Sequence, residues 1–157
     1  MKKYSREWWE SLDANRVGKE TEKIVEALFN EWNTKQCFAW HRMPDARSAR
    51  GALAAQPGDY VYFASKENRF MGGFIEVKAS KHPFRIAKDK VRQLPKLRVF
   101  DLAGADNIVL VHHYLEGVWR AVHTADLEVG QPSWDLSDIA KFPTPEEALN
   151  YAGISVK

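Results

Sequence analysis

Two neighbouring segments that favour β-structure, joined by a short polar stretch, constrain the fold of this chain most. Residues 59–63 and 73–78 are rich in aromatic and β-branched side chains, and the polar stretch between them ends in glycine. They predict an antiparallel hairpin that turns near residues 67–68. In this register Asp59, at the start of the first strand, lies opposite Glu76, near the end of the second.

The end of this hairpin brings three charged side chains together. Because side chains alternate along a strand, Glu76 and Lys78 leave it on one face while Val77 points to the other. With Asp59 opposite Glu76, two carboxylates and an ammonium group can hold a divalent cation against a phosphate, since Mg²⁺ prefers hard oxygen ligands. An ordinary solvated strand end remains the alternative, because Glu-x-Lys by itself arises by chance about once in such a chain.

The rest of the chain predicts an α/β fold of the mixed α+β kind, with a central sheet flanked by helices. Residues 14–32 carry an apolar stripe at helical spacing, and 37–41 form a short strand. We expect a helix over 85–103, in which Pro95 either kinks the helix or starts a second piece. A second hairpin over 108–122 completes the core.

The second hairpin and the C-terminus carry further signals. Residues 108–111 are continuously apolar, so this strand is expected to be covered on both faces. His112 and His113 follow in the same strand, so one should face inward and the other outward, which is a poor geometry for chelation. Thr144, followed by proline and two acids, predicts a short helix that ends at Gly153.

Composition places the chain among ordinary globular domains. With 157 residues, 45% hydrophobic and 28% charged, we expect one domain over 1–157, with a core over about 14–122 and an acidic extension over 123–157. No apolar run approaches the roughly 20 residues that cross a bilayer, and the N-terminus lacks a signal-peptide core. The single cysteine, Cys37, excludes an internal disulfide. A cytoplasmic protein without a membrane partner fits these features.

The charges are distributed unevenly along the chain. Between residues 78 and 98 eight basic side chains face Asp89 alone, whereas six acidic residues and two lysines lie between residue 123 and the end. A basic block directly after the carboxylates indicates a polyanion lying across the site, although a solvated surface explains such runs about as well. The candidate DNA contacts are Lys19, Arg42, Arg47, Arg50, Lys81, Arg85, Lys88, Lys90 and Arg92.

These motifs resemble the signature of the PD-(D/E)xK nuclease superfamily. Pro57-Gly58-Asp59 and Glu76-Val77-Lys78 match it, and the predicted element order is similar to its restriction-endonuclease-like core, αβββαβ, here with an added C-terminal hairpin and short helix. The superfamily commonly adds a glutamate four residues after a glycine on the first helix. In the segment 18–22 Glu22 is the better match and Glu20 the reserve.

Within the superfamily the chain looks most like the RecU-type Holliday junction resolvases. The likeness lies in residues 74–78, in 83–86, in Gln93 and in Gly104 with the apolar strand after it, and it spans about residues 15–122. It implies a Mg²⁺-dependent DNA endonuclease, with Mn²⁺ as a possible ion, that hydrolyses phosphodiester bonds of branched DNA. Resolvases of this group act as symmetric dimers, so a homodimer is implied as well.

The resemblance also assigns roles to residues. The implied catalytic residues are Glu22, Asp59, Glu76, Lys78 and Gln93. The implied metal ligands are Asp59, Glu76, the backbone carbonyl of Val77 and, directly or through water, Glu22. Lys78, beside two carboxylates, would stay protonated and orient the attacking water or stabilise the transition state. Trp8 and Trp9, ahead of the first helix, could serve a dimer contact.

Two alternatives remain open at this point. One is a restriction-type or phage-encoded nuclease that acts on ordinary duplex DNA. The other is a DNA-binding module that keeps the fold but does not cut. The presence of Asp59, Glu76 and Lys78 together weighs against the second alternative.

Overall fold

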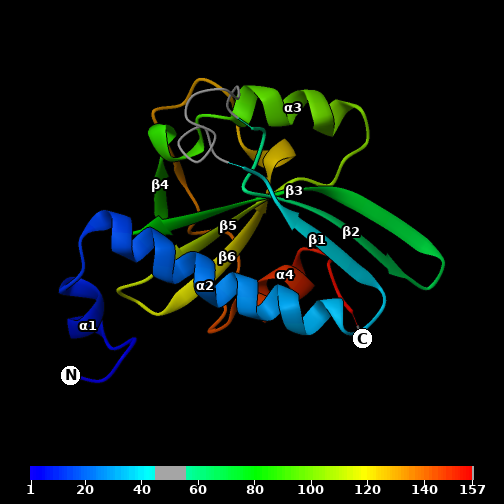
Figure 1. The fold of residues 1–157 in the computed structure, drawn as a ribbon. Coiled ribbons are helices and arrows are strands. Elements are labelled where there is room, and N and C mark those ends of the chain that lie inside the picture. The colour runs from blue at the N-terminus through cyan, green and yellow to red at the C-terminus, as the bar shows by residue number, and fades with distance from the viewer. Residues whose placement is uncertain (45–55, 157) are drawn as a thin grey trace.

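A mixed five-stranded sheet forms the centre of the molecule in the computed structural model, which describes residues 1–44 and 56–156 (Figure 1). The strand order is β1-β2-β3-β5-β6, and all neighbours are antiparallel except β3 and β5, which run parallel. The strands are β1 (Phe38–Arg42), β2 (Tyr60–Lys66), β3 (Arg69–Ser80), β5 (Ile108–His113) and β6 (Val118–His123). The predicted mixed sheet is therefore confirmed.

The hairpin formed by β2 and β3 has the register expected from the sequence. Tyr60 pairs with Ile75, so one further step along the ladder sets Asp59 against Glu76. The turn lies at residues 67–68, whose φ angles of 52° and 65° are the positive values that a two-residue type I′ hairpin turn requires.

Two helices cover one face of the sheet (Figure 1). Helix α2 (Ala14–Asn33) contacts β1 and β3, and α4 (Pro145–Tyr151) contacts β5 and β6. Phe29 of α2, buried completely, lies between the rings of Phe38 and Tyr60. This packing explains the apolar stripe that predicted α2. Within the described residues, no helix has both the length and the apolar character needed to cross a membrane.

The opposite face is covered by a second, smaller layer. It contains the two-stranded sheet β4 (Arg85–Ala87) and β7 (Ser133–Asp135), together with helix α3 (Leu94–Leu102). Ile86 and Trp134 from this layer pack in one buried cluster with Val109 and Val111 of β5. The remaining apolar residues of β5 face the α2 side, so the prediction of a strand covered on both faces is confirmed.

The same layer corrects the expectation for the two histidines. His112 and His113 are both buried, with 3% and 1% exposure, because each face of β5 is covered. The His112 ring stacks on Trp119 with centroids 4.0 Å apart, and burial lowers its pKa to about 3. The Nδ1 atom of His113 lies 2.6 Å from the carbonyl oxygen of His82. The alternation had predicted that one of the two histidines would face outward, but neither of them faces solvent.

The helix expected over residues 85–103 is wrong in its first part. Residues 85–87 form β4, a 3₁₀ helix η1 (Lys88–Val91) follows, and α3 begins only at Leu94 with Pro95 in its first turn. Ile86 pairs with Trp134 of β7, a partner that lies far away in the sequence. Pro95 thus begins a separate helix, which was the second of the two outcomes considered.

The N-terminal tryptophans lie in a helix that was not expected from the sequence. They belong to a short helix, α1 (Arg6–Glu10), that packs on the rest of the chain. Trp9 is only 2% exposed, and its ring centroid lies 5.1 Å from that of His112 and 5.6 Å from that of Tyr114. This indole is therefore engaged in internal packing, whereas a dimer contact through the partly exposed Trp8 stays a prediction.

Candidate active site

The site forms where β3 changes its pairing partner. The ladder between β2 and β3 ends at Ile75, whereas β5 pairs with residues 75–80 along the other edge of β3. Beyond Ile75 the Val77 N–H donates instead to Oδ2 of Asp59, at 2.8 Å. This hydrogen bond ties Asp59 to the end of β3 that carries Glu76 and Lys78.

The three charged groups predicted to cluster do lie together. Lys78 Nζ is 2.6 Å from Glu76 Oε1, and the two side chains are only 23% and 7% exposed. Burial, reinforced by the negative charge of Asp59, raises the pKa of Glu76 to about 7. Burial also raises the pKa of Asp59. For Lys78 burial acts against the charge, but Glu76 and Asp59 outweigh it and raise the pKa, so the ammonium group stays protonated.

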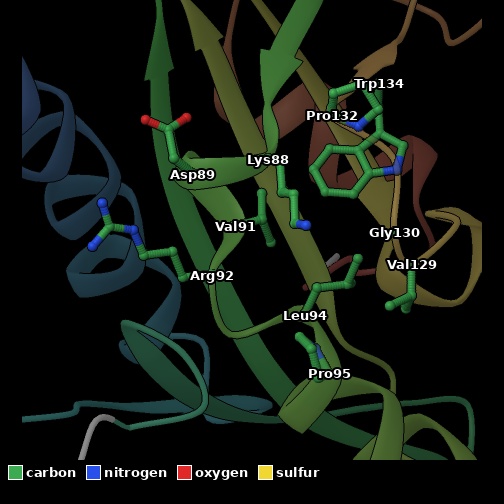
Figure 2. A pocket seen from close by; sticks show the side chains of 10 residues that line it. All are labelled: Lys88, Asp89, Val91, Arg92, Leu94, Pro95, Val129, Gly130, Pro132 and Trp134. Carbon is green, nitrogen blue, oxygen red and sulfur yellow. The ribbon is translucent and has the colours of Figure 1, made fainter.

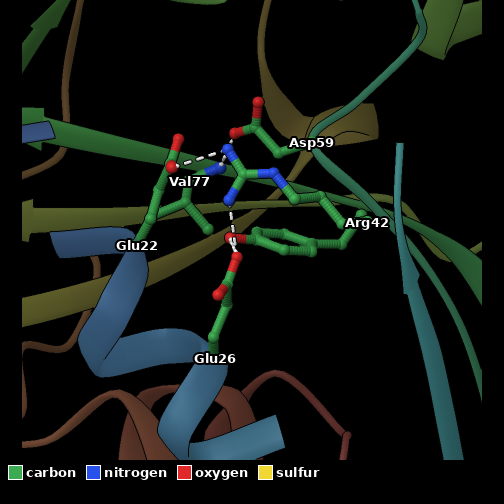
Figure 3. A network of polar contacts seen from close by, with 6 residues as sticks. Glu22, Glu26, Arg42, Asp59 and Val77 are labelled. Atoms are coloured by element: carbon green, nitrogen blue, oxygen red, sulfur yellow. Dashed lines mark hydrogen bonds and ion pairs between the residues drawn. The ribbon is translucent and has the colours of Figure 1, made fainter. Parts of the chain in front are cut away.

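The third carboxylate expected in the site has another partner (Figure 3). Arg42 Nη2 lies 2.9 Å from Glu22 Oε2, and its Nη1 lies 2.6 Å from Glu26 Oε1. The hydroxyl of Tyr60 donates to the same oxygen of Glu26, at 2.9 Å. Burial tends to lower the pKa of Arg42, but its hydrogen bonds to the two glutamates outweigh burial and raise that pKa. Arg42, expected to clamp a phosphate, is thus bound by two glutamates of helix α2 and lies next to Asp59.

Glu22 and Glu20 are distinguished by their surroundings. Glu20 lies 2.9 Å from Lys23 Nζ, with Lys3 Nζ at 3.7 Å, whereas Glu22 lines the same groove as Lys78. Burial raises the pKa of Glu22 even though Arg42 acts in the opposite direction. Glu22, the better match, is therefore the helix carboxylate beside the site.

These residues fit a divalent cation in part. Asp59 and Glu76 are two mostly buried carboxyl groups that repel one another, and a cation between them would relieve that repulsion. In the part of the chain that the structure describes, no group of three or more His, Cys, Asp or Glu side chains is arranged to hold a metal ion. Figure 3 shows Glu22 turned to Arg42.

An open groove of about 540 Å³ runs from this site along the first turns of α2 and the residues after β3. Of the candidate DNA contacts, three line it: Lys81, Arg85 and Lys90. Arg85 also contacts β7, through Asp135 at 3.4 Å. Lys19 is exposed on α2 but is not among the described residues that line the groove. Arg47 and Arg50 lie outside the described residues.

Gln93, to which the resemblance gave a catalytic role, does not lie on a helix that begins at residue 85. It occupies the position directly before α3, where its backbone carbonyl accepts a hydrogen bond from the N–H of Leu97 at 2.9 Å. It is not one of the described groove residues. The expectation had placed it on a helix continuous from residue 85, and that helix is interrupted.

A second pocket, of about 580 Å³, lies between η1 and the residues around the start of β7 (Figure 2). Its walls are mainly apolar, with Trp134 facing Val91 and the side chain of Lys88 between them. Asp89 and Arg92 point away from Trp134. The two pockets share no described lining residue: Lys88 and Arg92 line this one, whereas Lys90 lines the groove.

A buried arginine that was not singled out from the sequence supports the chain next to the groove residue His82. Arg120 of β6, only 5% exposed, donates from Nη1 to the carbonyl oxygen of Pro83 at 2.8 Å and from Nε to that of Ile139 at 3.0 Å. His113 holds the neighbouring carbonyl of His82. The available signal was an arginine inside the apolar strand 118–122, because arginine is rarely buried without such partners.

The raised pKa of Glu76 predicts how stability depends on pH without divalent metal. The ordinary pKa of a glutamate is 4.5, and in the folded protein the pKa of Glu76 is about 7. Between these two pH values Glu76 binds more protons in the folded protein than in the unfolded chain. The free energy of unfolding therefore falls as the pH rises through this window, by on the order of 3 kcal/mol. Glu76→Gln removes this loss and should raise the melting temperature at pH 8 by roughly 6 to 12 °C.

Thermal unfolding in EDTA at several pH values between 5 and 8 measures the effect. The gain of Glu76→Gln over the wild type should be largest at pH 8 and shrink towards pH 5. Glu31→Gln, a change of an exposed glutamate near the C-terminal end of α2, serves as the matched control. An equal gain of Glu76→Gln at both ends of the range would contradict the predicted titration.

Known proteins were compared with the chain as a sequence and as a structure. No protein-family model matches it, and no curated protein matches it either. Among solved structures it is similar to Hjc from Archaeoglobus fulgidus, a Holliday junction resolvase from an archaeal hyperthermophile. The TM-score is 0.50 and the identity 22%, over 84% of this chain and 99% of the other. The chain thus has the restriction-endonuclease-like fold that its motifs indicated.

Proposed function

We propose that this protein is a Mg²⁺-dependent DNA endonuclease whose preferred substrate is branched DNA. The observation that carries the proposal is the close grouping of Asp59, Glu76 and Lys78 at the place where β2 and β3 stop pairing. The fold of a protein described as a Holliday junction resolvase supports the branched substrate. We further propose a homodimer, because two strands of a branch must be cut, and the cytoplasm as the compartment.

In this proposal Asp59 and Glu76 would hold Mg²⁺ or Mn²⁺, together with the Val77 carbonyl and Glu22. The ion would act as a Lewis acid that lowers the pKa of bound water and neutralises charge on the phosphate. Lys78 is held at 2.6 Å from Glu76 and remains protonated, so it can donate to the phosphate oxygen on which charge builds. Burial of the carboxylates strengthens each of these electrostatic interactions.

The groove suggests where the substrate backbone lies. Lys81 and Lys90 are exposed and line the groove that contains Glu22 and Lys78. Replacing both lysines by alanine should weaken DNA binding and reduce the slope of log affinity against log salt by about 2, since each phosphate contact contributes about 0.9. Binding measured in EDTA at increasing salt concentration, so that the DNA stays intact, tests this.

Lys35 and Lys141 provide the control for that experiment. Both are exposed lysines that are not among the described residues lining the groove. Their double alanine variant has the same change in net charge and should keep most of the wild-type salt slope. If both double variants lose the same slope, the groove lysines contribute only through the overall charge of the protein.

Cleavage assays on matched substrates test the proposed function itself. The protein is incubated with a synthetic four-way junction and with linear duplex of the same sequence, each with Mg²⁺ or with EDTA. We expect cleavage of the junction only in Mg²⁺, and little cleavage of the duplex. Comparable cutting of both substrates would favour a nuclease acting on ordinary duplex. Binding without cleavage under any divalent metal would favour a non-cutting module.

A further inference from the structure

The contact between Arg42 and Glu22 joins two elements that could otherwise act separately. Glu22 lies on α2 and Arg42 ends β1, and the ion pair between them measures 2.9 Å. The guanidinium also binds Glu26 on the next turn of α2, at 2.6 Å. A guanidinium that engages two carboxylates through separate nitrogens is fixed in both position and orientation.

The neighbours of this ion pair are the groups of the carboxylate site. The positive charge of Arg42 acts on Asp59, and the negative charge of Asp59 acts on Glu22. Figure 3 shows the guanidinium between Asp59 and the two glutamates of α2. Arg42 therefore supplies the positive charge that a divalent cation would otherwise supply beside Glu22.

We propose that Arg42 is a positioning residue that competes with the divalent cation for Glu22, so that the site is completed only when Arg42 releases this carboxylate. This inference rests on the proposed function, because it assumes that Asp59 and Glu76 bind the cation. It explains why, among the described residues, two carboxylates and not three are grouped where β2 and β3 stop pairing.

The release has a consequence for the substrate. Arg42 is half exposed, at 50%, so once it leaves Glu22 its guanidinium can bind an anion from solution. A phosphate of the DNA backbone is such an anion and accepts two hydrogen bonds from a guanidinium. Arg42 would then have the phosphate contact expected from the sequence, but only after the cation has taken its place at Glu22.

A double-mutant cycle on Glu22 and Arg42 tests the competition. Binding of Mn²⁺ alone, without DNA, is followed by the loss of the electron paramagnetic resonance signal of the free ion. We expect Arg42→Gln to tighten Mn²⁺ binding about tenfold, whereas Glu22→Gln changes it less than about twofold in the wild type. In the Arg42→Gln background Glu22→Gln should cost about tenfold, because Glu22 is then available as a ligand.

Two further variants separate this competition from a general effect of charge. Glu26→Gln removes the other partner of Arg42 but leaves the 2.9 Å contact with Glu22, so it should leave Mn²⁺ affinity within about twofold of the wild type. Arg42→Lys keeps the charge but cannot bind Glu22 and Glu26 through separate nitrogens, so it should give an intermediate gain in Mn²⁺ affinity. Thermal unfolding in EDTA confirms that each variant is folded.

Each outcome decides between two proposals. If the effects of Glu22→Gln and Arg42→Gln multiply within about twofold, Arg42 does not compete for Glu22 and this inference is overturned. If Asp59→Asn binds Mn²⁺ as the wild type does, the carboxylate pair is not the metal site and the proposed function fails. If no variant binds Mn²⁺, both proposals fail together.

Discussion

Asp59→Asn and Glu76→Gln are each expected to lower the rate of DNA cleavage by at least about 10³-fold while DNA binding stays near wild type. Each change removes a proposed metal ligand, and the loss of several kcal/mol of transition-state stabilisation corresponds to this factor. Binding should persist because each change also removes a negative charge near the phosphate. Single-turnover cleavage of a junction in Mg²⁺ and a binding titration in EDTA measure the two quantities separately.

The Asp59→Asn variant is well suited to this test because its fold should be retained. The amide oxygen of asparagine can still accept the hydrogen bond that the Val77 N–H donates over 2.8 Å to Asp59. Glu20→Gln is the matched control, since Glu20 contacts Lys23 and should leave cleavage unchanged. A loss of affinity as large as the loss of turnover would show that these carboxylates act in binding or folding and not in the chemical step.

Gly73→Ala is expected to reduce the free energy of unfolding by about 3 kcal/mol, enough to leave part of the protein unfolded at 37 °C. A Cβ atom at Gly73 would lie 2.5 Å from the backbone oxygen of Asp106 and 2.8 Å from Oδ1 of Asn107. Both oxygens are already engaged, because the Tyr62 hydroxyl donates to the first and the Phe74 N–H to the second. The clash therefore disrupts the connection between β3 and the start of β5.

Gly18→Ala provides a control of the opposite sign. Gly18 lies inside α2, and apart from its chain neighbours and the backbone of the helix itself no heavy atom lies within 4 Å of the Cβ that alanine would add. Alanine favours the helix by up to about 1 kcal/mol over glycine, so this variant should be more stable than the wild type. Urea denaturation of both variants measures the difference, and a Gly73→Ala protein as stable as the wild type would refute the close packing at that position.

The hairpin shows how much of the site could be predicted from the sequence. Its two segments favour strands, the turn between them accommodates positive φ, and the side-chain period of two leaves one register that buries the apolar faces. These local properties placed Asp59 opposite Glu76 and set Lys78 on the same face as Glu76. The grouping of the three charges therefore needed no knowledge of the rest of the chain.

The remaining parts of the site depend on partners that are distant in the sequence. Glu22 was identified by its spacing from Gly18, but its pairing with Arg42 required the position of β1 relative to α2. Residues 85–87 became a strand because β7, nearly 50 residues later, supplied the hydrogen-bonding partner. A helical composition in this segment could not reveal that partner.

The hairpin, its register and the three charges at its end follow from local sequence alone, because strand alternation and turn chemistry act over a few residues. The folded structure was needed to show that Glu22 binds Arg42, that Arg120 binds the carbonyl of Pro83 and that both histidines of β5 are buried. Each of these features arises where separate layers meet. Burial and charge pairing between layers depend on the whole fold, so a local pattern can indicate a buried residue but cannot name its partners.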